Sequence, residues 1–189
     1  RFDGTRSACD WSGVLPASAA PWVVRSDYVA NSNNSYEVPH PAERLTDISP
    51  VFGPSGAGLS LRANLGLNMV EDRLAGTDGL GDGGFTPTLA KDVFFGARNR
   101  AGELLADGIV AECRATPVGV VDGVEVDLAG VCTALDDWDR RNTVASPGAA
   151  VFRGLWMAME DPEQLFAVPA SIAEPLTTPS GFTEDAERR

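Results

Sequence analysis

Residues 31–35 gather three side-chain amides and two hydroxyls directly after the short apolar run of residues 28–30. Such a run is typical of a strand, and a strand held in a sheet can aim the side chains that follow it at a ligand. An asparagine amide directed at a developing oxyanion lowers the barrier of acyl transfer by about 3 to 4 kcal/mol. The same composition is also typical of an Asx-turn cluster that only ends a strand, so the residues alone leave both interpretations open.

Other residue types that could do chemistry give weaker signals. His40 lies between two prolines and has no visible serine partner, so it is interpreted as a loop residue and not as a general base. Asp78 and Asp82 lie in a glycine-rich stretch, but the alternating oxygen ligands and the closing glutamate of a calcium loop are absent. There is also no Cys-x-x-Cys pair, and the sequence predicts no metal site.

The elements that must position these residues begin with residues 1–58, which are extended and rich in turns. Strand-like runs at residues 22–24 and 28–30 predict that this part belongs to a sheet. At the other end, residues 162–189 are rich in proline and are predicted to form an irregular tail that is truncated. Neither terminus carries a folding signal of its own, so both are interpreted as cuts inside a longer polypeptide.

The middle part, residues 59–161, is predicted to be mainly helical. Leu61, Leu65 and Met69 fall on one stripe of a helix, and comparable stripes recur further along the chain. An Asp-Gly pair within residues 118–126 takes positive φ angles readily and predicts a small β-hairpin there. The fold class expected from these patterns is α+β.

Three cysteines leave more than one arrangement open. Cys113 closes one predicted helix and Cys132 lies inside the next, a spacing compatible with a disulfide between two packed helices. This disulfide is favoured over two free thiols in the core. Cys9 is then left over, either buried as a small hydrophobic residue or paired with chain outside this sequence.

Composition excludes two classes of partner. The 27 acidic residues outnumber the 15 lysines and arginines, for a net charge of −12 over 189 residues, which would repel a phosphate backbone. Nucleic acid is therefore not an expected partner. No apolar run approaches the about 20 residues that cross a bilayer, so no membrane span is expected.

Four motifs resemble, in their order and spacing, the large subunit of the penicillin acylase family. They are Arg6-Ser7-Ala8-Cys9-Asp10-Trp11, residues 28–36, Leu45-Thr46-Asp47-Ile48-Ser49-Pro50, and Leu61-Arg62. Within the family the likeness is to the acylases that act on aculeacin-type lipopeptides and on acyl-homoserine lactones. Further likeness at Cys113-Arg114 and at residues 127–139 and 148–153 extends the resemblance over about residues 4–160.

The resemblance implies a fragment of the αββα core of the N-terminal nucleophile hydrolases, followed by the mainly helical region. In that class a precursor cuts itself and frees a serine whose own amino group acts as base, and this serine lies outside the present chain. The resemblance assigns Asn33 as the oxyanion donor, Arg62 as the residue that orients Asn33, and Asn31 as structural. Asn34 stands where many relatives carry an acidic residue.

The function that this resemblance implies is part of a secreted or periplasmic amidohydrolase. It would cleave the amide bond of acyl-homoserine lactones, lipopeptide antibiotics or penicillin-like amides, and the choice among them depends on pocket residues that the sequence does not identify. The expected partners are the remaining acylase chain or small subunit and an acyl-amide substrate, and the chain alone is expected to be inactive. No cofactor is expected, although relatives can carry a structural calcium. The alternative is a non-catalytic helical structural or binding module derived from an acylase.

Overall fold

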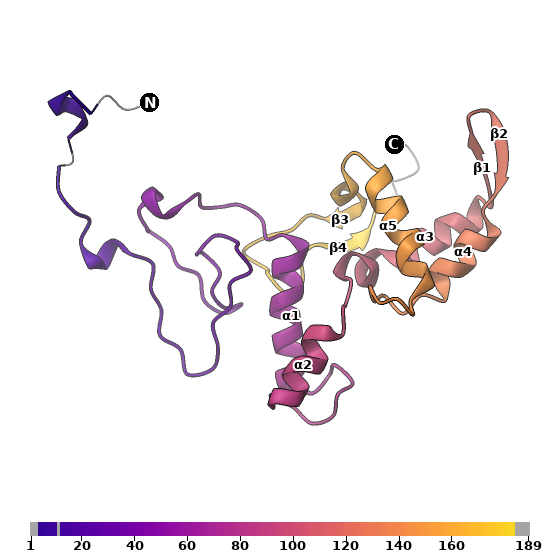
Figure 1. The fold of residues 1–189 in the computed structure, drawn as a ribbon, viewed down its shortest axis with the longest axis horizontal. Helices are drawn as coiled ribbons and strands as arrows, with labels where there is room; N and C mark the ends of the chain where they lie inside the picture. Colours follow the sequence, from indigo (N-terminus) through magenta and orange to yellow (C-terminus); the bar gives the residue numbers. More distant parts are fainter. Residues whose placement is uncertain (1–3, 11, 184–189) are drawn as a thin grey trace.

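The computed structural model describes residues 4–10 and 12–183. The chain is extended in its N-terminal part and mainly helical further along (Figure 1). The part before the first helix runs as an extended trace and contains three short 3-10 turns, η1 (Ser7–Cys9), η2 (Ala17–Ala19) and η3 (Pro50–Phe52). The helix α1 stands between this trace and a group of three helices at the other end of the molecule. None of the helices in the described part is both long and apolar enough to cross a bilayer.

Local capping signals place the first three helices. In α1 (Leu61–Ala75) the Ser60 hydroxyl accepts from the amide of the third residue, and Gly76 ends the helix with a positive φ of 71°. Thr86 caps α2 (Pro87–Phe95), whose first residue is a proline that has no amide hydrogen to lose. Asn99 caps α3 (Arg100–Ala115) in the same manner as Ser60. The expectation of helices in this region is confirmed.

A β-hairpin forms where the Asp-Gly pair predicts it. Strands β1 (Val118–Val121) and β2 (Val124–Asp127) pair antiparallel, with Val121 opposite Val124. Asp122 and Gly123 between them both have positive φ, at 52° and 81°, as a type I′ turn requires. The hairpin protrudes beyond the helices and leads into α4 (Ala129–Asp136).

The main core lies between α3, α4 and α5 (Pro147–Ala158). Trp138 is at its centre with 2% of its surface exposed, and its ring packs against Phe152 at 4.9 Å between centroids. A Cβ atom at Gly148 would overlap both Trp138 and the Ala134 carbonyl, so the close approach of α5 to α4 requires glycine there. Together with the hairpin, these helices support the α+β class.

The Pro-rich tail is more ordered than the irregular tail that the sequence predicts, because it contains two paired strands. After η4 (Pro162–Leu165), strand β3 (Phe166–Val168) pairs antiparallel with β4 (Ser180–Phe182). Between these strands the chain folds back onto α1, where the fully buried Asn64 side chain donates to the carbonyl oxygens of Pro175 and Thr178, both within 2.9 Å. These contacts join residues more than 100 positions apart, which sequence pattern alone does not reveal.

The strands expected in residues 1–58 do not form within the described residues of that range. The chain there is extended but pairs only through isolated contacts, such as the Ala30 amide with the Pro39 carbonyl at 2.8 Å and a single bridge between His40 and Glu43. A strand needs a neighbouring strand to satisfy its backbone groups. The described part of this chain offers none at that place.

The predicted disulfide is present. Cys113 at the end of α3 and Cys132 in α4 are bonded, with their Cα atoms 5.6 Å apart. Cys9 is an exposed free thiol, so the interpretation of Cys9 as a buried hydrophobic residue is wrong. The bond ties two core helices together across the hairpin.

Replacing both bonded cysteines by serine should lower the free energy of unfolding by about 3 kcal/mol, because the bond closes a loop of 19 residues in the unfolded chain. Urea denaturation followed by circular dichroism measures the difference. Cys9→Ser is the matched control and should leave the urea midpoint unchanged. A double serine variant as stable as the parent would show that the bond contributes nothing.

Candidate active site

The loop of residues 31–34 is closed by its own asparagines. Asn31 accepts through Oδ1 from the Asn33 amide at 2.8 Å and donates through Nδ2 to the Asn34 carbonyl at 3.2 Å. Asn34 accepts through Oδ1 from the Ser32 amide at 2.8 Å. Two of the three side-chain amides therefore hold the turn, as the Asx-turn interpretation requires, and the third is left over for another role.

Asn33 is that third amide, and the structure brings it to Arg62. Its backbone has a φ of 60°, in the left-handed region that asparagine tolerates better than most residues. Arg62, the second residue of α1, donates from Nη1 to Asn33 Oδ1 at 3.0 Å. A guanidinium has only donors, so the amide oxygen must face Arg62. The Nδ2 group of Asn33 then points elsewhere, and it donates to no acceptor among the described residues.

A polar cluster anchors the chain just before this loop. The Tyr28 hydroxyl donates to the Glu71 carboxylate on α1, and burial together with this bond raises the pKa of the Tyr28 phenol. Arg25 donates two hydrogen bonds, of 2.6 and 2.7 Å, to the Asp27 carboxylate. This contact lowers the pKa of the Asp27 carboxyl. The loop is thus tied to α1 at Tyr28 as well as at Asn33.

His40 is part of the same cluster. It is 7% exposed, and its ring lies 4.5 Å from that of Tyr28 between centroids. Its Nδ1 accepts from the Ala42 amide at 3.1 Å, and its Nε2 lies 3.4 Å from both Arg25 Nη2 and Asp27 Oδ2. The ring is therefore a buried support with both nitrogens engaged, a role that agrees with the interpretation of His40 as no general base.

A small cavity of about 310 Å³ opens beside Asn33 and Arg62. Its lining includes Ser32, Asn34, Val38 and Leu59, with Ile172 from the folded-back tail. On another side Glu37, only 6% exposed, accepts from the Gly56 amide at 2.5 Å. The cavity contains the polar loop and one wall of apolar side chains, a composition suited to a substrate group next to a hydrogen-bond donor.

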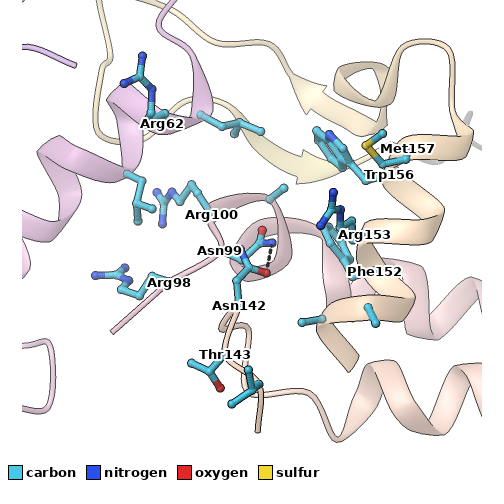
Figure 2. Close-up of a pocket in the computed structure, with 16 residues that line it drawn as sticks. Arg62, Arg98, Asn99, Arg100, Asn142, Thr143, Phe152, Arg153, Trp156 and Met157 are labelled. Carbon is cyan, nitrogen blue, oxygen red and sulfur yellow. Dashed lines mark hydrogen bonds between the residues drawn. The ribbon is translucent and has the colours of Figure 1, made fainter. Parts of the chain in front are cut away.

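A larger cleft of about 750 Å³ shares Arg62 with this cavity and extends between α1, the start of α3 and α5 (Figure 2). At its floor Asn99 donates to Asn142 at 3.1 Å. Arg98, which also lines the cleft, pairs with Glu103 at 2.6 Å and with Asp72 at 2.8 Å. Burial alone would raise the pKa of Glu103, but the bonds from Arg98 and Arg100 outweigh it and hold that pKa below its ordinary value.

No group of three or more metal-binding side chains occurs within residues 4–10 and 12–183. In the glycine-rich stretch, oxygen atoms of the loop are bound by Arg73 of α1. Its fully buried guanidinium donates to Asp78 at 2.7 Å, to the Gly81 carbonyl at 2.8 Å and to the Asp82 carbonyl. No sequence pattern predicts this burial, because Arg73 lies on a helix face that only the following loop covers.

Comparison with known proteins gives a consistent result. The penicillin amidase family model matches residues 1–185. Aculeacin-A acylase of Actinoplanes utahensis is 36% identical over 197 residues, which take in 100% of this chain and 25% of that protein. Acyl-homoserine lactone acylase PvdQ is 30% identical in Pseudomonas syringae pv. syringae and 31% in pv. tomato, over 96% of this chain and 23% of each relative. The chain spans about a quarter of the length of these relatives.

The ion pairs of Glu103 predict acid sensitivity. Because the folded pKa of Glu103 is depressed, its stabilisation is complete above the ordinary pKa of 4.5 and is lost as the pH falls below that value through the folded pKa. Glu103→Gln should lower the unfolding free energy at pH 7 by about 1 kcal/mol and flatten its decline below pH 4.5. Urea titrations between pH 3 and 7 test this, with Glu112→Gln on the same helix as control. Equal pH profiles for the parent and Glu103→Gln would contradict it.

Proposed function

The chain belongs to the penicillin amidase family, and from this premise we propose that it is part of an amidohydrolase that cleaves the amide bond of an acylated substrate. One observation carries the proposal. Arg62 holds the oxygen of the Asn33 side chain at 3.0 Å, which turns the Nδ2 donor of the same amide away from Arg62. A donor fixed in this way suits the stabilisation of a negatively charged oxygen.

The proposed chemistry is acyl transfer to water through a serine supplied by another part of the polypeptide. The serine hydroxyl adds to the substrate carbonyl, and its own free amino group takes up the proton. Negative charge then builds up on the carbonyl oxygen, where Asn33 Nδ2 donates to it. Collapse of the intermediate breaks the C–N bond, and the amine leaves with the proton that the amino group of the serine had taken up. Water then hydrolyses the acyl-serine ester and frees the carboxylic acid and the serine. No step needs an organic cofactor.

Arg62 is proposed as a positioning residue. Its charge would also strengthen the donor, because a guanidinium on the amide oxygen draws electron density from the amide nitrogen. The hydrogen bond from Tyr28 to Glu71 and the bond from the Asn33 amide to Asn31 restrict the movement of Asn33. Preorganisation of this kind is what makes a single neutral donor effective.

The substrate classes proposed are acyl-homoserine lactones, lipopeptide antibiotics and penicillin-like amides. The names of the relatives, an aculeacin-A acylase and acyl-homoserine lactone acylases, support the first two. The proposed partner is the remaining acylase chain or small subunit, which would supply the serine, so this chain alone would be inactive. A secreted or periplasmic location is supported by the disulfide, which persists in oxidising compartments.

In the complete acylase, Asn33→Ala should reduce kcat by about two to three powers of ten with little change in KM, because it removes a bond made in the transition state. Asn34→Ala is the matched control from the same loop, since its amide binds only backbone groups. It should reduce kcat far less. Equal losses for both variants would assign the effect to loop disruption, and full activity of Asn33→Ala would remove Asn33 from the site.

A double-mutant cycle tests the role of Arg62. If Arg62 acts through Asn33, then Arg62→Ala should lower kcat strongly in the parent enzyme but only slightly in the Asn33→Ala background. Steady-state kinetics of the four proteins measures the coupling. Additive losses would show that Arg62 acts independently of the amide.

A further inference from the structure

The larger cleft has a charge opposite to that of the molecule. Its lining contains four arginines, Arg62, Arg98, Arg100 and Arg153, and neither an aspartate nor a glutamate. The chain as a whole carries 27 acidic residues against 15 basic ones. A cleft whose charged side chains are all positive, in so acidic a protein, favours an anionic occupant.

Two of these arginines are already neutralised by carboxylates that do not line the cleft. Arg98 pairs with Asp72 and Glu103, and Arg100 pairs with Glu103 at 3.1 Å. The other two are not. Arg62 binds the neutral Asn33, and Arg153 makes no ion pair or hydrogen bond within the described part of the chain. The cleft therefore carries uncompensated charge at Arg153, on the side away from the proposed reaction centre.

The wall around Arg153 is apolar. Phe152 and Trp156 stack at 5.9 Å between centroids and 24° between ring planes, on the same helix as Arg153. Met157 is 71% exposed beside them. In Figure 2, Arg153, Trp156 and Met157 stand on one side of the cleft, while Arg62, Arg98 and Arg100 stand on the other. A volume of about 750 Å³ suits a small ligand better than a single ion.

We propose that this cleft binds a small organic carboxylate with an apolar body. The Arg153 guanidinium takes the carboxylate through its paired N–H donors, and the apolar body lies along Trp156 and Met157. An inorganic anion would leave the apolar wall unused, and a nucleic acid would meet the net negative charge of the protein. This binding does not rest on the proposed amide hydrolysis.

Decanoate, held below its micelle concentration, is the probe. Isothermal titration calorimetry with the full chain should show saturable binding of one equivalent, and Arg153→Gln should raise the Kd by about fivefold, as expected for an exposed charge pair. Arg153→Lys should retain most of the affinity. Lys91→Gln, which removes one positive charge from exposed α2 outside the cleft, is the matched control and should bind like the parent.

A second pair of variants guards against misfolding at Arg153. The exposed Met157 tolerates a charge, so Met157→Glu should weaken decanoate binding by repulsion while Met157→Lys should not. Absence of binding to the parent, unchanged affinity of Arg153→Gln, or equal binding of decylamine would overturn the proposal. If the parent self-associates and Arg153→Gln abolishes this association, the proposal is overturned too, because a second copy would then be the occupant. None of these measurements involves turnover, so their failure leaves the proposed function intact.

Discussion

The contact between Arg62 and Asn33 is the constraint on which the arrangement of the site depends. It joins the first turn of α1 to a loop 29 positions earlier in the chain, and it decides which end of the Asn33 amide faces outward. An amide that was free to turn over would present its oxygen as often as its nitrogen. The guanidinium removes that choice because it can only donate.

The rest of the N-terminal part serves this contact more than it serves a core. Residues before α1 bury few apolar side chains. Their main hydrophobic contact is the cluster in which Val38 and Leu59 pack with Ala63 and Leu67 of α1. Polar ties do the remaining work, from Tyr28 to Glu71 and within the asparagine loop itself. The three-helix core, stabilised by Trp138 and the disulfide, supplies a rigid body against which α1 and the tail are fixed.

Arg62 also connects two chemically different spaces. The small cavity at Asn33 is lined mainly by the polar loop, whereas the cleft beyond Arg62 combines arginines with an aromatic wall. Arg62 lies on α1 and lines both the small cavity and the larger cleft. The packing of α1 against α3 therefore sets how the cavity and the cleft lie relative to each other. That placement depends on Asn64, which accepts from Arg100 at 2.7 Å while it donates to the tail.

The sequence by itself determined the features that arise from neighbouring residues. The caps at Ser60 and Thr86, the Asp122-Gly123 turn and the disulfide between successive helices all lie where local patterns place them, because short-range sterics and hydrogen bonds decide them. For Asn33 and Arg62 a family resemblance suggested the roles, but the distance between them comes only from the structure.

Tertiary structure alone decided the rest. The described extended residues before α1 form no strand, the tail folds back over Asn64, and Arg73 is fully buried. Each of these outcomes depends on which distant surface covers a backbone group or a charge. The free energy of such burial is set by the partner and not by the residues next in the chain.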